Sequence, residues 1–480
     1  MTSLNAFLAL AHVIASLLVT AHVLLHNRDV RAAIGWIGVA WLSPAIGPFL
    51  YYAFGINRVT RRALRLPMPS PRRGARGQHR GPDTSAADRE MVGERLPDQI
   101  ATIAAVAAKV TELPLLPGNR VDLLESGDRA YPVMLEAIEN ARTCIAVMSY
   151  IFRADEVGAA FIDALARARA RGVEVRAIVD GIGGGYLWSP AVRRLHAAGI
   201  PVGRFMHFVL PWRMPFLNMR SHKKVLVIDG ALGFTGGLNL GNENTRILHR
   251  RRQVRDVHFR IEGPAVSQLM LTFAEDWFFT RREVLDDPMW WPDIPSAGNV
   301  MARGVSSGPD DRLGELESVM AVAVCEARHR IRIVSPYFLP DQRLASALLL
   351  AALRGVEVQL VIPERSDHPV LDWAMRSHLE EFLQVGIACH LTPPPFDHSK
   401  LITVDGAWSL LGSANWDVRS LRLNFEFNVE CYGEETAAVI DRLIDSKIAR
   451  SKTLSARELS SRRAPIRFRD AATRLMLPYL

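Results

Sequence analysis

Cysteine is scarce in this 480-residue sequence, which has four, at Cys144, Cys325, Cys389 and Cys431. No two of them form a Cys-x-x-Cys pair and none belongs to a His-rich cluster, so their spacing excludes a zinc-finger type of metal site. Four thiols in a chain of this length also exclude a small disulfide-stapled scaffold. They indicate ordinary buried thiols in a reducing compartment.

Charged residues are also few, at 22%, against 49% hydrophobic residues, which excludes disorder of the whole chain. The length suits roughly two to four domains. The net charge of +8 would suit a nucleic-acid-binding protein, but it is unevenly spread: residues 56–80 contain eight Arg and no acid, residues 447–480 carry +7, and residues 81–446 carry −8. A net acidic body between two basic segments argues against a nucleic-acid partner and for anionic membrane lipids.

The N-terminal region contains two long uncharged runs, residues 4–25 and 32–55, separated by only six residues. Each is long enough to cross a bilayer core of about 30 Å, so the sequence predicts an antiparallel transmembrane hairpin, with the second span bent by Pro44, Gly47 and Pro48. The first six residues lack the positive charge of a signal peptide. By the positive-inside bias, the eight Arg after the second span predict a multi-pass membrane protein with the following domain in the cytoplasm.

The body contains an internal repeat. The pentapeptide Arg-Gly-Val-Glu-Val occurs at residues 171–175 and again at 354–358. Before each copy the sequence has an apolar strand that ends in Ser and Tyr, followed by an Ala-rich helical pattern. After each copy come a short strand, a helix and a Gly-Ile dipeptide. This order predicts two homologous α/β halves on largely parallel sheets.

The domain boundaries follow from the repeat, the charge distribution and the Pro-rich stretch before the second half. We expect a hairpin at 1–55, a basic connecting segment at 56–110, a first half at 111–280, a linker at 281–308, a second half at 309–446 and a basic C-terminal tail at 447–480.

Each half ends in the same pattern, His-x-Lys-x4-Asp with an Asn ten residues later. Its members are His222, Lys224, Asp229 and Asn239 in the first half and His398, Lys400, Asp405 and Asn415 in the second. On a strand the His and Lys of each motif project on the same side. An ammonium group neutralises phosphoryl oxygens while an imidazole acts as nucleophile or acid, and a two-fold relation between the halves would bring the two imidazoles to one site.

The paired motifs resemble those of the phospholipase D superfamily. The N-terminal hairpin and the segments at 255–258, 335–340 and 417–421 make the chain similar to the bacterial cardiolipin synthases of the two-transmembrane type. The resemblance implies two phospholipase D-like α-β-α halves with mixed, largely parallel sheets behind the hairpin. It also implies transfer of a phosphatidyl group between two phosphatidylglycerol molecules through a phosphohistidine, without a metal or a cofactor.

The resemblance further implies a role for each site residue. His222 would be the nucleophile and His398 the acid and later the base, although the near-symmetric sequence does not itself fix that order. Asp256 and Glu426 would orient the imidazoles of His222 and His398 respectively. Four residues would hold the phosphoryl oxygens: Lys224, Lys400, Asn239 and Asn415. The Asp of each catalytic motif, Asp229 and Asp405, would tie down the motif loop.

Three alternatives and three local features stay open at this point. A phospholipase D-type hydrolase, or a phosphatidyltransferase with another donor or acceptor, uses the same chemistry, whereas a nuclease and a non-catalytic scaffold fit the hairpin, the acidic body and the intact motifs less well. Asp397 either raises the pKa of His398 or faces solvent. Residues 205–219, rich in large apolar side chains, form either a buried loop or a membrane-facing segment beside the site. Residues 460–480, with five Arg and an apolar end, are a second candidate for contact with the membrane surface. The sequence leaves the oligomeric state open.

Overall fold

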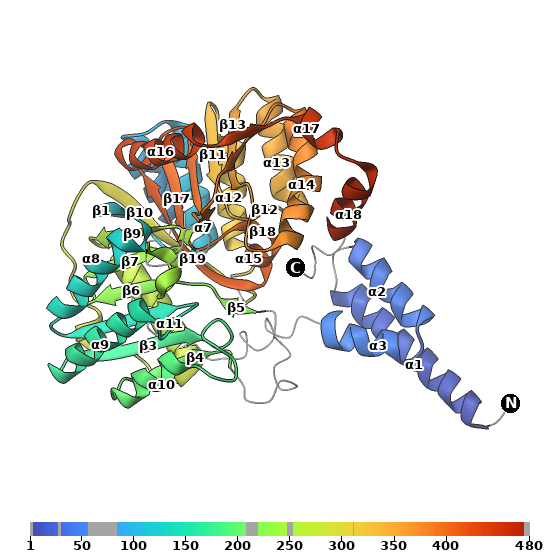
Figure 1. Cartoon of the computed structure of the whole chain (residues 1–480), viewed down its shortest axis with the longest axis horizontal. Helices are drawn as coiled ribbons and strands as arrows, with labels where there is room; N and C mark the ends of the chain where they lie inside the picture. Colours follow the sequence, from blue (N-terminus) through green and yellow to red (C-terminus); the bar gives the residue numbers. More distant parts are fainter. Residues whose placement is uncertain are drawn as a thin grey trace. The chain divides into compact units, whose positions relative to one another are not determined.

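A computed structural model describes residues 3–26, 30–55, 84–207, 219–246, 253–310 and 312–474 of the chain. The described residues fall into two units: N-terminal helices within residues 3–55, and a body formed by residues 84–474 (Figure 1). The basic segment 56–80 and most of the apolar stretch 205–219 lie outside the described residues.

The N-terminal unit begins with helix α1, Ser3–His26, which packs against helix α2, Val30–Leu42. Within the described part of the chain, α1 is the one helix that is long and apolar enough to span a membrane. Polar contacts join the two helices, because Ser16 Oγ donates to the carbonyl of Ala40 at 2.8 Å and Trp41 Nε1 donates to Thr20 Oγ1 at 3.1 Å. These contacts make an antiparallel helical hairpin, as expected.

The second uncharged run, residues 32–55, bends at Pro44, as expected, and forms more than one helix. Helix α2 has 13 residues, about 20 Å, and ends before Pro44, which cannot donate a helical hydrogen bond. Ala45 then adopts φ 63°, and the chain continues as the short helix α3, Ile46–Leu50, and the π-helical turn η1, Tyr51–Gly55. At Gly47 a Cβ would lie 2.1 Å from the carbonyl oxygen of Val39, so glycine permits α3 to lie close to α2.

The body is built on one long mixed sheet with helices against it (Figure 1). The strand order is β20-β14-β13-β11-β16-β17-β19-β10-β1-β9-β7-β6-β2-β3-β4. Reading outward from the central antiparallel pair β1 and β10, the two directions give matching strands, with β20 as one addition at the edge. The sheet therefore has the pseudo-two-fold arrangement that the sequence repeat predicts.

The first half contains the following elements: β1 Leu116–Glu125, α8 Ser126–Asn140, β2 Cys144–Ser149, α9 Glu156–Ala170, β3 Glu174–Asp180, α10 Pro190–Ala197, β4 Val202–Phe205, β5 Arg220–Ser221, β6 Val225–Ile228, β7 Leu232–Gly236, η3 Asn242–Asn244, β8 Val254–Arg255, β9 Val257–Glu262 and α11 Val266–Arg281. Strands β2, β3 and β4 are parallel, whereas β6, β7 and β9 are antiparallel to their neighbours.

The second half repeats this series: β10 Val300–Ser307, α12 Glu315–Glu326, β11 Arg330–Val334, β12 Phe338–Leu339, α13 Gln342–Leu353, β13 Glu357–Pro363, α14 Pro369–Gln384, β14 Ala388–Thr392, β15 Phe396–Asp397, β16 Leu401–Val404, β17 Trp408–Gly412, β18 Trp416–Asp417, α15 Val418–Arg422, β19 Asn424–Tyr432 and α16 Glu434–Ala449. The equivalent helices α9 and α13 begin alike, because Asp155 and Asp341 each accept a hydrogen bond from the third residue after them.

Three segments expected outside the two halves belong to the folded body. Residues 300–307 of the expected linker form the buried strand β10, after the short helix η4, Pro288–Trp290. Helices α6, Thr84–Gly93, and α7, Asp98–Thr111, contribute to the hydrophobic core of the second half. In the C-terminal segment, β20, Lys452–Leu454, pairs with β14, and α17, Ala456–Ser460, and α18, Ala464–Arg474, pack against α14.

Candidate active site

The two motif histidines are positioned by short strands that cross between the halves. Strand β5, just before His222, pairs with the start of β19 in the second half, and the backbone N–H of His222 donates to the carbonyl of Phe425 at 2.8 Å. Strand β15, just before His398, pairs with β8 in the first half, and the N–H of His398 donates to Arg255 at 2.7 Å. Each histidine therefore lies against the opposite half.

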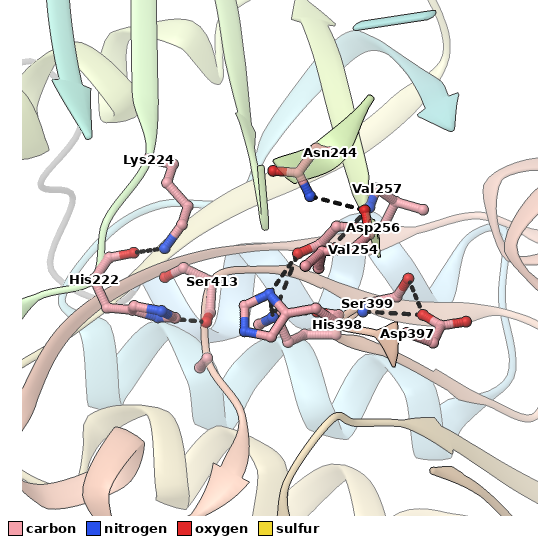
Figure 2. A network of polar contacts seen from close by, with 12 residues as sticks. His222, Lys224, Asn244, Val254, Asp256, Val257, Asp397, His398, Ser399 and Ser413 are labelled. Carbon is pink, nitrogen blue, oxygen red and sulfur yellow. Dashed lines mark hydrogen bonds and ion pairs between the residues drawn. The ribbon is translucent and has the colours of Figure 1, made fainter. Parts of the chain in front are cut away.

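The crossing brings the two imidazoles together, as the repeat predicts. Their ring centroids are 6.2 Å apart and the rings are nearly perpendicular, at 84°. Figure 2 shows His222 and His398 side by side among the polar groups of both halves. A phosphorus atom placed between the rings would be within attacking distance, about 3 Å, of both.

The carboxylate partners are also crossed, so the sequence-based pairing of Asp256 with His222 and of Glu426 with His398 is wrong. Oε2 of Glu426 accepts from His222 Nδ1 at 3.0 Å, and Oδ2 of Asp256 accepts from His398 Nδ1 at 2.7 Å. Sequence position suggested a partner within the same half, but β5 and β15 carry each histidine across. Gly237 permits the arrangement, because a Cβ there would lie 2.2 Å from Oδ1 of Asp256.

These contacts engage Nδ1 of both imidazoles. The carbonyl of Ser413 also lies 3.0 Å from His222 Nδ1, and Nζ of Lys400 lies 2.6 Å from His398 Nδ1, so Nε2 of each ring is the nitrogen left for chemistry. Burial is the main reason that the pKa of His222 falls to about 4. Glu426 raises this pKa, but the charge of Lys224 lowers it. Burial and Lys400 likewise lower the pKa of His398.

The two motif lysines are buried beside the histidines. Nζ of Lys224 donates to the carbonyl of His222 at 2.6 Å, and Lys400 makes the equivalent bond to the carbonyl of His398. Burial lowers the pKa of both lysines, that of Lys224 to about 7. Burial disfavours ionisation of Asp256, but Lys400, 3.5 Å away, and His398 outweigh it and hold the pKa of Asp256 at about 2.

A cavity of about 690 Å³ opens onto the histidines, within the size range of small-molecule sites. Asn239 and Asn415 line it, and Oδ1 of Asn415 is a buried acceptor without a hydrogen bond in the described structure. Sequence reasoning did not assign four further lining residues to the site, namely Tyr150, Tyr337, Arg220 and Arg419. The two tyrosines could have been found, because they stand at equivalent strand ends of the repeat.

Asp229 and Asp405, placed with the catalytic motifs in the sequence, lie at the far ends of β6 and β16 from the histidines. Asp229 accepts hydrogen bonds from the backbone N–H groups of Arg142, Thr143 and Cys144, at 2.7 to 3.1 Å. Asp405 does the same for residues 328–330. Both have φ 50°, a left-handed conformation that suits a tight turn. They anchor loops and do not line the cavity.

We expect Asp229→Ala to lower the free energy of unfolding by about 2 kcal/mol, because a carboxylate that bonds three backbone N–H groups is lost. The rate constant kcat at a temperature where the variant is folded should fall less than about 3-fold. Thermal unfolding and turnover measured on the same preparation check this. A large fall in kcat without a change in stability would instead make Asp229 part of the reaction.

Asp397, next to His398, is neither solvent-facing nor a source of a raised pKa at that histidine. It is buried, accepts from Lys447 Nζ of α16 at 2.5 Å and accepts from Ser399 Oγ at 2.7 Å. Burial opposes its ionisation, yet Lys447 and Ser399 hold the pKa of Asp397 below its usual value. The pKa of His398 is lowered, the opposite of the expected direction. The ion pair fixes the strand behind the imidazole.

The chain matches known protein families over most of its length. The family model described as cardiolipin synthase, phospholipase D-like domain, matches residues 134–277 and 322–448, and a model for a phospholipase D-nuclease N-terminal region matches residues 14–55. A cardiolipin synthase from Oceanobacillus iheyensis is 32% identical over 99% of both chains. Cardiolipin synthase A from Pseudomonas fluorescens is 32% identical over 99% of this chain and 98% of its own.

Among solved structures, a phosphatidylserine synthase from Haemophilus influenzae superposes with a TM-score of 0.61 at 16% identity, covering 78% of this chain and 99% of its own. At this identity the likeness shows the fold alone. The near-full-length relatives, the matched family model and the paired histidine motifs agree, and the chain belongs to the cardiolipin synthase family of phospholipase D-like proteins.

Proposed function

We propose that this chain makes cardiolipin by moving a phosphatidyl group from one phosphatidylglycerol to a second through a phosphohistidine, with glycerol as the other product. The observation that carries the proposal is the pair of imidazoles 6.2 Å apart, each held at Nδ1 by an acidic side chain of the opposite half. Two imidazoles facing one phosphorus can supply both a nucleophile and a proton donor.

In the first step the neutral His222 attacks phosphorus through Nε2. Its lowered pKa keeps the lone pair available. The bond from phosphorus to the glycerol oxygen breaks, and that oxygen takes a proton from Nε2 of His398. The negative charge of the bound phosphodiester favours the imidazolium form that His398 needs, and Asp256 stabilises the same form.

In the second step the terminal hydroxyl of another phosphatidylglycerol gives its proton to Nε2 of His398. Its oxygen attacks phosphorus, the bond from phosphorus to His222 breaks, and cardiolipin is released. Throughout, Lys224 and Lys400 offset the charge on the phosphoryl oxygens, and the amides of Asn239 and Asn415 donate to them. Because two ammonium groups supply this neutralisation, the proposal needs neither a metal ion nor a cofactor.

The membrane setting of the proposal rests on α1 and on the charge distribution. We place the protein in the bacterial inner membrane as an integral, multi-pass protein with its body in the cytoplasm. Support comes from the antiparallel contacts of α1 and α2 and from the eight Arg of residues 56–80. Phosphatidylglycerol is itself anionic, which suits this basic segment.

One described loop of the body is suited to contact lipid. Leu187 and Trp188, between β3 and α10, are 86% and 65% exposed, and the guanidinium of Arg193 lies 4.1 Å from the centre of the Trp188 ring. The same loop lies close to the cavity, because a Cβ at Gly183 would be 2.4 Å from the ring of Tyr150. An apolar pair beside a cation is typical of a bilayer interface.

We expect Trp188→Glu to lower turnover on phosphatidylglycerol vesicles about 10-fold, since a carboxylate replaces an interfacial aromatic ring. Turnover of a short-chain soluble phosphatidylglycerol should change less than about 2-fold. Leu350→Glu, at an exposed leucine of α13, serves as the matched control and should affect neither. Equal losses on both substrates would contradict a lipid-facing role for this loop.

Labelled phosphatidylglycerol, given alone to the detergent-purified protein in the presence of a chelator, tests the function. Cardiolipin with an equal amount of glycerol is the expected outcome. Phosphatidic acid alone would identify a hydrolase. Product formation only after addition of a second lipid or alcohol would identify another donor or acceptor, and loss of activity with the chelator would overturn the mechanism.

A further inference from the structure

The C-terminal segment of the body carries positive charge that the proposed reaction does not use. Residues 462–474 contain five arginines and one aspartate, and they form α18 together with the residues just before it. The helix packs against α14, and Figure 1 shows the two next to each other. Some of these arginines hold the helix in place, and the others are exposed.

One face of α18 is fixed to the body. The carboxylate of Asp470 is fully buried and accepts hydrogen bonds from Arg462 at 2.5 Å and from Arg469 at 2.7 Å. The guanidinium of Arg469 also lies 4.2 Å from the centre of the Trp373 ring of α14. Thr473, about one turn after Asp470, is buried on the same face. These ion pairs and the cation–π contact engage the charge of both arginines.

The opposite face of α18 is exposed and basic. Residues at spacing i, i+3, i+4 and i+7 share this surface, which we call the α18 face: Ala464, Arg467, Phe468 and Ala471. Phe468 is 78% exposed. In the described part of the chain, neither Arg467 nor Arg463, the exposed residue just before the helix, forms an ion pair. An exposed ring beside unpaired cations is typical of a helix at a bilayer interface.

Helix α18 lies next to the active-site cavity. Leu459 of α17 lies with Met375 in the middle of α14, whereas Arg469 of α18 contacts Trp373 near the start of α14. The chain therefore runs from α17 through α18 toward the first turn of α14, and residues 369–371 of that turn line the cavity. A bilayer bound to the α18 face is consequently held close to the cavity.

The first half has an exposed aromatic residue at the equivalent place. Trp188 lies just before α10, which is the counterpart of α14 in the repeat, and both helices begin with a proline, Pro190 and Pro369. Trp188 therefore lies beside the cavity in the first half, and the α18 face lies beside it in the second. Surfaces suited to lipid in both halves fit a cavity whose substrate comes from a bilayer.

We propose that the α18 face docks on an anionic bilayer, with its arginines at the lipid headgroups and the ring of Phe468 in the interface. The inference goes beyond the proposed reaction and rests on the proposed membrane setting. The N-terminal helices can keep the chain in the membrane, but the cavity belongs to the body, which needs a lipid-facing surface of its own. The acidic surface of a second copy would match the arginines, but it would leave Phe468 without an apolar partner. The apolar, uncharged sequence of residues 475–480 also favours lipid.

A fluorescent label at position 468 measures docking without catalysis. Cys325 is exposed and the other three cysteines are buried, so Phe468→Cys in a Cys325→Ala chain gives one accessible thiol for an environment-sensitive dye. The full-length protein is reconstituted in phosphatidylcholine vesicles with or without about 40% phosphatidylserine. We expect the anionic lipid to shift the emission to the blue, and lipids brominated on the acyl chains to quench it. The same dye on Leu353→Cys, at a leucine of α13 that is 69% exposed, should show neither effect.

Turnover separates docking from the reaction itself. Arg467→Gln and Phe468→Ser should each lower cardiolipin formation in the phosphatidylserine vesicles about 5-fold, the order expected for one base or one ring at an anionic surface. In detergent micelles, which have no charged bilayer, each should change it less than about 2-fold. Salt at about 0.5 M should lower the wild type in vesicles to the level of Arg467→Gln, because it screens the attraction. Arg442→Gln, at an exposed arginine of α16, and Leu353→Ser are the matched controls and should change neither rate.

The same emission with and without anionic lipid would overturn the docking surface, as would variants that match the wild type in vesicles. Equal losses in vesicles and in micelles would also overturn it, and melting temperatures measured beside the rates would then show whether the fold is damaged. Loss of a dimer from micelles in the variants would make a second copy the occupant instead of lipid. A labelled protein that shows the blue shift, when the wild type forms no cardiolipin, would overturn the proposed function and support the docking surface.

Discussion

Replacement of His222 or of His398 by alanine is expected to lower cardiolipin formation by at least about four orders of magnitude. Each imidazole faces the same phosphorus, and neither can take over the role of the other because each Nδ1 is held by its own carboxylate. Product analysis of labelled phosphatidylglycerol measures the loss. His196→Ala, at an exposed histidine of α10, is the matched control and should keep full activity.

A change of leaving group separates the two histidines. A phosphatidyl ester of p-nitrophenol releases an anion that needs little protonation, so it bypasses the acid. His398→Ala should therefore still release about one equivalent of p-nitrophenol in a single turnover, whereas His222→Ala should release none. The opposite result would exchange the two roles, and cardiolipin synthesis by either variant would contradict the two-histidine mechanism.

The repeated motifs could be predicted from sequence because their signals are local. The strand, helix and strand around each Arg-Gly-Val-Glu-Val pentapeptide depend on neighbours within about thirty residues, and the structure contains them as β2, α9 and β3 and as β11, α13 and β13. The meeting of His222 and His398 followed from the duplication. Anchoring of loops by Asp229 and Asp405 was expected from the family resemblance.

The crossed partners could not be predicted in the same way. They depend on the pairs β5 with β19 and β8 with β15, each two residues long and joined across more than a hundred residues of sequence. Two-residue strands leave no hydrophobic periodicity. The docking of residues 84–111 on the second half is also a tertiary effect, because the same composition suits a solvated connector.

The crossed carboxylates lead to the second large effect. Asp256→Asn and Glu426→Gln should each lower kcat about 10³-fold, since an amide cannot stabilise the imidazolium or hold the same tautomer. Removal of Asp256 also lowers the pKa of His398, because the carboxylate favours the charged ring. The fall of kcat toward high pH should accordingly begin at a lower pH in Asp256→Asn than in the wild type. Rates across pH 5 to 9 give both quantities.

The p-nitrophenyl donor also identifies which histidine each carboxylate serves. If the partners are crossed, Asp256→Asn behaves as a milder His398→Ala and keeps most of its p-nitrophenol release, whereas Glu426→Gln loses it together with His222→Ala. Pairing within each half would group the variants the other way. This grouping holds whichever imidazole attacks phosphorus, because it compares each carboxylate with its own histidine. The active site then requires both halves for every proton transfer, and neither half alone contains a complete histidine and carboxylate pair.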